Sequence, residues 1–116
     1  MTERIKERVQ VAVSTALDKK AVDLEVLEVR ELTSLADYFI ICSGTSDRML
    51  DALADEIGKN IKKYDGWVGK AEGRPADGWI VFDIGDIVVH LFITEQREYY
   101  QLEQLWQEGK VLLRVQ

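Results

Sequence analysis

The stretch WIVFDIGDIVVHLFI (Trp79 to Ile93) consists of two apolar runs separated by Gly85-Asp86. A two-residue connection of this type is a strong signal for a β-hairpin. In such a hairpin Ile84 and Ile87 oppose each other, and pairing outward from them sets every later partner. The predicted pairs are then Asp83 with Val88, Phe82 with Val89, Val81 with His90, Ile80 with Leu91, and Trp79 with Phe92.

The two faces of this hairpin differ in chemistry, because the side chains of a strand alternate between faces. One face has no polar side-chain atom and is predicted to be core: Ile80, Phe82, Ile84, Ile87, Val89 and Leu91. The other face mixes large aromatic residues with an acid and an imidazole: Trp79, Val81, Asp83, Val88, His90 and Phe92. Burial under a helix would desolvate Asp83 and His90, whereas full exposure would leave large aromatic rings in water. The pattern favours a protein interface; the alternative is that the terminal helix covers this face and a local hydrogen bond satisfies His90.

Around the hairpin, the spacing of apolar residues predicts further helices and strands. Helices are predicted over 3–18, about 47–63 and 94–107, and strands over 24–30, 38–42 and 66–72, with 110–115 as a candidate final strand. In the last helix Tyr99, Leu102, Leu105 and Trp106 are expected inward or partly so, and Tyr100, Glu103 and Gln104 outward. The predicted fold class is α/β (α+β), one domain over 1–116, with helices packed on a mixed sheet of about five strands.

The composition and charge of the chain narrow the range of functions that it can have. The chain has 116 residues and a net charge of −6, which suits one domain and disfavours nucleic-acid binding through phosphates. Residues 77–108 hold seven acids against one base, Arg97. Such a block attracts basic partners, although a purely solubilising surface is the alternative. No apolar run approaches the roughly 20 residues of a membrane span, and no secretory signal is visible, so a cytoplasmic protein without membrane contact is expected.

Each candidate catalytic or metal-binding motif in the sequence lacks part of the residue set that its chemistry needs. Gly44-Thr45-Ser46 follows an apolar run and opens a predicted helix, where nucleotidyltransferases place a phosphate-binding element. Such enzymes also need two magnesium-binding carboxylates two residues apart on a following strand. Asp23 and Glu25 have this spacing but precede the motif, and Asp83 and Asp86 lie three residues apart across a turn. One cysteine, Cys42, and one histidine, His90, cannot form a Cys/His zinc site, and a cysteine ending a buried run is typical of a core residue. No catalytic residue, metal or cofactor is therefore expected.

Three segments together resemble the ribosomal silencing factor family, also called RsfS or Iojap. They are TSLADYFIICSGTSDR (Thr33 to Arg48), GWIVFDIGDIVVHLF (Gly78 to Phe92) and EQREYYQLEQLW (Glu95 to Trp106). The segments occur in order and at the right separation. The resemblance extends from the first helix to Trp106 and leaves 107–116 as a C-terminal extension.

The resemblance implies a nucleotidyltransferase-like fold without catalytic activity. Members of the family bind a protein of the large ribosomal subunit, large-subunit protein fourteen, at the surface that meets the small subunit. They block subunit joining and so lower translation when nutrients are short, and they tend to form homodimers in isolation. Transferred to this chain, the binding elements are Trp79, the strand containing His90, and the helix from Tyr100 to Trp106.

We therefore expect a binding site for a basic ribosomal protein. Its residues are Trp79, Val81, Asp83, Val88, His90, Phe92, Glu95, Tyr100, Glu103 and Trp106. Trp79 and Phe92 are expected at the apolar centre, and Asp83, Glu95 and Glu103 opposite basic side chains. The alternatives are a magnesium-dependent nucleotidyltransferase-like enzyme and a generic dimeric adaptor whose hairpin face is its own dimer contact.

Overall fold

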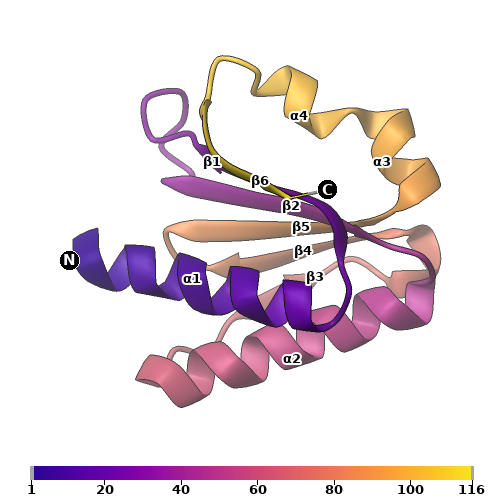
Figure 1. Cartoon of the computed structure of the whole chain (residues 1–116), viewed down its shortest axis with the longest axis horizontal. Helices are drawn as coiled ribbons and strands as arrows, with labels where there is room; N and C mark the ends of the chain where they lie inside the picture. Colours follow the sequence, from indigo (N-terminus) through magenta and orange to yellow (C-terminus); the bar gives the residue numbers. More distant parts are fainter. Residues whose placement is uncertain (1, 116) are drawn as a thin grey trace.

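The protein is one mixed β-sheet with helices on both faces (Figure 1). The computed structural model describes residues 2–115, apart from the side chains of Thr2, Glu3 and Leu105, so the expected inward orientation of Leu105 lies outside the described residues. The sheet order is β3-β4-β5-β2-β1-β6. The elements are α1 (Thr2–Asp18), β1 (Val22–Glu28), β2 (Tyr38–Gly44), α2 (Asp47–Asp65), β3 (Lys70–Glu72), η1 (Pro75–Asp77), β4 (Trp79–Ile84), β5 (Ile87–Ile93), α3 (Thr94–Tyr100), α4 (Leu102–Leu105) and β6 (Lys110–Val115).

The predicted hairpin register is confirmed at every pair, from Ile84 opposite Ile87 to Trp79 opposite Phe92. Gly85 has φ +74°, the left-handed conformation that glycine adopts without strain, and this allows the tight connection. The all-apolar hairpin face is buried in the main core, together with the apolar stripe of α2 and residues of α1. α1 and α2 lie side by side on this face of the sheet (Figure 1).

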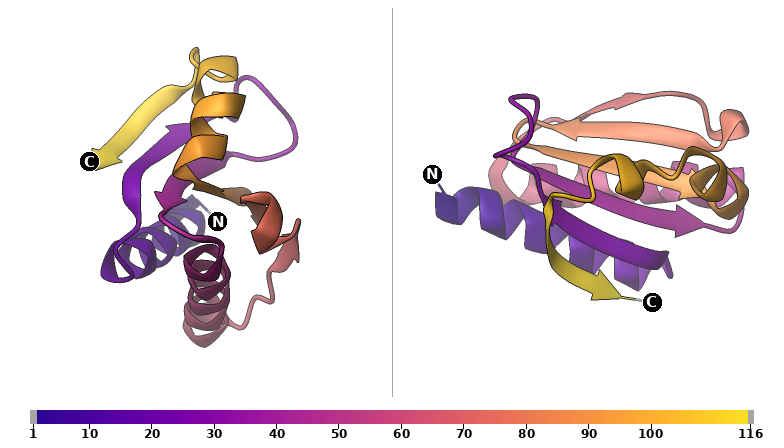
Figure 2. Two further views of the ribbon diagram at one scale, coloured as in Figure 1. Left: turned by 90° about the vertical axis from the view of Figure 1, so that its right-hand side faces the viewer. Right: turned by 90° about the horizontal axis from the view of Figure 1, so that it is seen from above.

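A second, smaller core lies on the opposite face, beneath α3 and α4. Its buried members are Leu27, Val29, Ala36, Phe39, Ile41, Phe92 and Leu102, and Trp79, Val88 and Trp106 pack against it while partly exposed. The central strands β2 and β5 pair in parallel. β1 pairs antiparallel with β2, and β4 pairs antiparallel with β5. In Figure 2, α3 and α4 lie across the middle of the sheet, over β5 and β2.

The expected single helix over 94–107 is wrong, because it is broken at Gln101. Gln101 has φ +49°, and its N–H donates to Arg97 O, which ends α3 before α4 begins. In a continuous helix Arg97 and Glu103 would point about 120° apart around the axis. The break brings the two together at 2.8 Å, and it leaves Tyr99 78% exposed rather than inward.

The sheet has six strands instead of about five, because Lys110–Val115 pairs antiparallel with β1. This strand forms one edge, and the short strand β3 forms the other. Within 2–115, no helix combines the length and the hydropathy that crossing a membrane requires.

Candidate protein-binding site

An open strip of sheet remains beyond the edge of α3 and α4. It consists of Glu72 on β3, Trp79, Val81 and Asp83 on β4, and Val88 on β5, all of which are exposed or half-buried. Glu72 lies opposite Val81, and Asp83 opposite Val88, so these side chains share one face. We call these five residues the open strip. Its chemistry is an apolar centre with carboxylates at the margin, where one base, Lys70 opposite Asp83, lies 3.9 Å from the carboxylate of Glu72.

Trp79 is held in place from three sides. Its ring stacks on Phe92 with centroids 4.9 Å apart and lies 4.7 Å from the ring of Tyr100. Its indole Nε1 donates a long hydrogen bond, 3.4 Å, to Nδ1 of His90. The side chain is therefore ordered before any partner arrives, while part of it still faces solvent. A preorganised, partly exposed tryptophan is typical of an interface anchor.

Phe92 and His90 are not at the surface, which corrects the expectation that Phe92 forms the apolar centre of the contact. Phe92 is fully buried and His90 is 8% exposed. α3 folds back over the end of β5, so that Tyr100 lies over Phe92, and Phe39 of β2 packs edge-on against the imidazole at 5.0 Å. The alternative of a covering terminal helix is therefore correct for this half of the face. Both residues support Trp79 from beneath.

Tyr100 and Trp106 connect the covered half to the open strip. Tyr100 is exposed, as expected, and Trp106 is half-buried with its ring edge-on to Phe39 at 5.2 Å. Of the acids expected to face a partner, Asp83 and Glu95 are exposed. Glu103 is not free for this purpose, because its Oε2 accepts a hydrogen bond from Nε of Arg97.

His90 is a neutral histidine in the native protein. Burial lowers its pKa to about 4, because the charged ring would lose its hydration. Since Nδ1 accepts from Trp79, the single proton of the neutral ring lies on Nε2, which has no hydrogen-bond partner among the described residues. Protonation would place a second hydrogen on Nδ1 and remove the acceptor that holds the indole of Trp79.

We expect this histidine to make the protein less stable in acid. The unfolded chain binds this proton with a pKa near 6.5, whereas the native protein binds it near 4. Between these values the unfolded state holds more protons, so the free energy of unfolding falls as the pH is lowered, by roughly 2–3 kcal/mol between pH 7 and 4.5. Urea unfolding at both pH values measures the loss. His90→Gln should show a smaller loss, and an equal loss in this variant would contradict the assignment.

Sequence comparison identifies the family to which this chain belongs. A family model described as "Ribosomal silencing factor during starvation" matches residues 2–115. The chain belongs to the ribosomal silencing factor family. The match includes β6, so the segment 107–115 lies within the family model.

Individual relatives agree with this assignment. The ribosomal silencing factor RsfS of Bacillus subtilis is 39% identical over 101 residues, which cover 87% of this chain and 86% of that protein. The mouse protein named "Mitochondrial assembly of ribosomal large subunit protein 1" is 39% identical over 84% of this chain and 44% of its own length. A crystal structure of a Chromobacterium violaceum protein matches with a TM-score of 0.83 and 34% identity, covering 89% of this chain and 86% of that one. The bacterial relatives are named silencing factors, not enzymes.

The residues considered as candidates for enzymatic chemistry have structural roles in this ribosomal silencing factor. Ser46 Oγ accepts from the Met49 N–H and caps α2, so Gly44-Thr45-Ser46 forms a capped strand-to-helix turn. Glu25, half of the only carboxylate pair with metal spacing, binds arginines through both of its oxygens. Cys42 is fully buried, and burial raises its pKa to about 12, so it is a thiol rather than a reactive thiolate at neutral pH.

Two residues of the site were missed from the sequence. Phe39 pairs with Val88 across the parallel β2–β5 contact, so it shares the face of His90. The apolar run Tyr38 to Cys42 gave no face pattern, and only the β2–β5 register identifies Phe39. Glu72 reaches the open strip through a three-residue strand. So short a strand carries no clear alternation in the sequence.

Proposed function

We propose that this ribosomal silencing factor binds a basic protein of the large ribosomal subunit, large-subunit protein fourteen, through the open strip. The observation that carries the proposal is the partly exposed Trp79, fixed between Phe92, Tyr100 and His90, with the exposed carboxylates of Glu72 and Asp83 on the same face. Ribosomal proteins carry the basic side chains that such a margin attracts. The name of the mouse relative, which refers to assembly of the large subunit, supports this choice of target.

The contact would have an apolar centre and an acidic rim, the usual anatomy of a protein interface. Trp79, Val81 and Val88 supply the centre, with Tyr100 beside them. Asp83, Glu72 and Glu95 supply the rim. His90, Phe92, Trp106 and Glu103 act indirectly in this proposal, because they shape and hold the surface from beneath or behind.

Silencing by this route needs no chemical step. The chain measures 35 × 32 × 24 Å, and a body of this size on the joining surface of the large subunit excludes the small subunit sterically. Occupancy then depends on concentration and affinity, and the joining equilibrium shifts by mass action. We propose that this represses translation when nutrients are limiting.

The acidic rim is expected to act mainly on the rate of association. The double variant Asp83→Asn/Glu95→Gln should associate more slowly at low salt, and its rate should fall less steeply as salt is added. Stopped-flow binding to large subunits at two salt concentrations measures both effects. Asp51→Asn/Asp55→Asn removes two exposed acids from α2, on the opposite face of the sheet, and serves as the control. Equal slowing by the two double variants would assign the effect to net charge alone.

We propose in addition that the free protein forms a homodimer. The generic-adaptor alternative places the dimer contact on the open strip, and Trp79→Glu would then produce a monomer in analytical ultracentrifugation. A variant that stays dimeric and no longer binds large subunits would separate the two surfaces.

A subunit-joining assay tests the proposed function. Purified small and large subunits are mixed at a magnesium concentration that permits joining, and light scattering follows the formation of intact ribosomes. Addition of the protein to the large subunits beforehand is expected to reduce the amplitude in proportion to occupancy. Trp79→Glu at the same concentration is expected to leave the amplitude unchanged. Full joining at saturating wild-type protein would overturn the proposal.

A further inference from the structure

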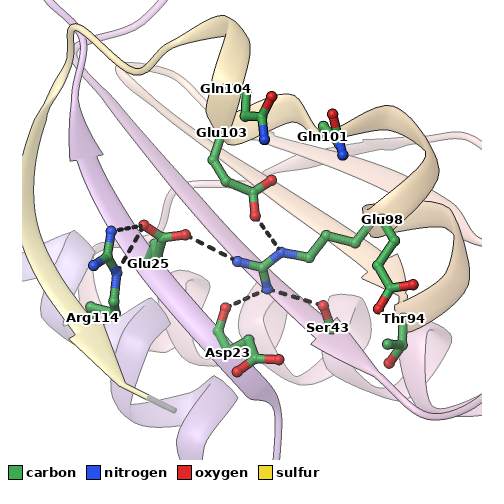
Figure 3. Close-up of a pocket in the computed structure, with 10 residues that line it drawn as sticks. Asp23, Glu25, Ser43, Thr94, Glu98, Gln101, Glu103, Gln104 and Arg114 are labelled. Atoms are coloured by element: carbon green, nitrogen blue, oxygen red, sulfur yellow. Dashed lines mark hydrogen bonds and ion pairs between the residues drawn. The ribbon is translucent and has the colours of Figure 1, made fainter.

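Arg97 on α3 is a buried arginine whose partners come from three other elements (Figure 3). Its Nε donates to Glu103 of α4 at 2.8 Å, and its Nη2 donates to Glu25 of β1 at 3.3 Å. Its Nη1 donates to Ser43 Oγ of β2 at 3.0 Å and to the carbonyl oxygen of Asp23. These groups line a pocket of about 420 Å³. A buried guanidinium is stable only with such partners, so this side chain ties the segment after β5 to the middle of the sheet.

α3 and α4 have few other attachments. α3 has seven residues and α4 has four, and neither begins with a side-chain cap. Helices this short are not stable by themselves. Leu102 of α4 and Trp106, which directly follows α4, make apolar contacts with the second core. Within α3, Arg97 is the buried residue, and it therefore sets where α3 lies on the sheet.

The position of α3 determines the shape of the open strip. Tyr100 lies three residues after Arg97, and its ring is 4.7 Å from Trp79 and 6.3 Å from Phe92. If α3 moved away from the sheet, Trp79 would lose one of its three supports and Phe92 would lose its cover. The apolar centre that a partner meets would then change in shape.

Glu25 extends this network to the far edge of the sheet. Its Oε2 accepts from Arg97, and its Oε1 accepts from Arg114 of β6, at 3.2 Å from Nε and 3.0 Å from Nη2. Figure 3 shows the carboxylate of Glu25 beside the guanidinium group of Arg114. β6 is an edge strand that pairs with β1, and Arg114 on it is connected to Arg97 of α3 through the carboxylate of Glu25. The carboxylate is thereby fixed in the orientation that Arg97 requires.

We propose that Arg97 is the positioning residue of the open strip, and that Arg114 on β6 acts on the strip through Glu25 and Arg97. The inference rests on the proposed function and assigns a role in it to β6, which lies outside the open strip. Arg97 contacts no partner in this account; it holds the surface in its binding shape.

The test compares two buried arginines. Arg8 on α1 is buried like Arg97, pairs with Asp65 at 2.6 Å and lies over the ring of Trp67, on the helix-covered core side of the sheet. Arg97→Gln and Arg8→Gln are compared by the indole N–H resonance of Trp79 in NMR spectra and by equilibrium binding to isolated large subunits. Arg97→Gln is expected to shift the Trp79 resonance and to weaken binding at least about tenfold, because Trp79, the anchor of the proposed interface, loses its support from Tyr100. Arg8→Gln is expected to leave both unchanged, even where its melting temperature falls as far.

Further variants keep the test decisive. Arg114→Gln is expected to shift the Trp79 resonance in the same direction as Arg97→Gln, by a smaller amount. If Arg97→Gln does not fold, Arg97→Lys replaces it, because lysine keeps the charge and loses the simultaneous contacts. A Trp79 resonance at its wild-type position in the folded Arg97 variant, or equal losses of affinity in the Arg8 and Arg97 variants, would overturn the inference. Failure of the wild-type protein to bind large subunits would instead overturn the proposed function, while the resonance still decides the positioning role.

Discussion

Replacing Trp79 with glutamate is expected to weaken binding to the large ribosomal subunit by more than about 2 kcal/mol, roughly 30-fold in affinity. The indole is half-exposed and preorganised by Phe92, Tyr100 and His90, so its loss removes the central apolar contact. The fold should survive, because a half-buried residue at the first position of β4 contributes less to the core than the residues beneath it. Fluorescence anisotropy of a labelled chain, titrated with isolated large subunits, measures the affinity.

Trp67→Glu is the matched control for this variant. Trp67 is 41% exposed and lies between α2 and β3, against the guanidinium of Arg8 rather than on the open strip. The same chemical change there is expected to leave the affinity unchanged. Wild-type affinity in a folded Trp79→Glu variant would remove Trp79 from the binding site.

Truncating Phe92 to alanine is expected to produce the largest loss of stability, roughly 3–5 kcal/mol of unfolding free energy. Phe92 is fully buried in the second core, and its ring stacks on that of Trp79 with centroids 4.9 Å apart. This loss would be a large fraction of the 5–15 kcal/mol typical of small domains. Urea denaturation followed by far-ultraviolet circular dichroism measures it.

Two comparisons make the Phe92 result specific. Phe92→Leu keeps most of the buried volume and should lose much less stability. Tyr99→Ala removes an aromatic ring that is 78% exposed and should change stability by no more than about 0.5 kcal/mol. A loss below about 1 kcal/mol for Phe92→Ala would mean that α3 does not cover this ring.

The hairpin was predictable because its information is local. Gly85-Asp86 sets the register, and strict alternation then separates the core face from the mixed face. The unusual composition of the mixed face also identified Trp79 as the side chain to follow. The charge pattern located the exposed acids Asp83 and Glu95 but gave no sign that Glu103 has a partner within the chain.

The covering of that face was not predictable, because it depends on contacts between distant segments. Arg97 meets Ser43 and Glu25, which lie 54 and 72 residues away in the sequence. The break at Gln101 contains neither glycine nor proline, and it forms because the tertiary contacts of Arg97 and Leu102 favour it. The periodicity of the sequence by itself therefore predicts one helix that continues to Gln107, and it does not show that Phe92 is covered.

The most direct measurement is where the purified protein sediments when it is mixed with ribosomal particles. On sucrose gradients it should comigrate with isolated large subunits and be absent from intact ribosomes, since the small subunit already occupies the face that the open strip would contact. Trp79→Glu should remain at the top of the gradient in both cases. Equal comigration of the wild-type protein with intact ribosomes, or none with large subunits, would contradict the account.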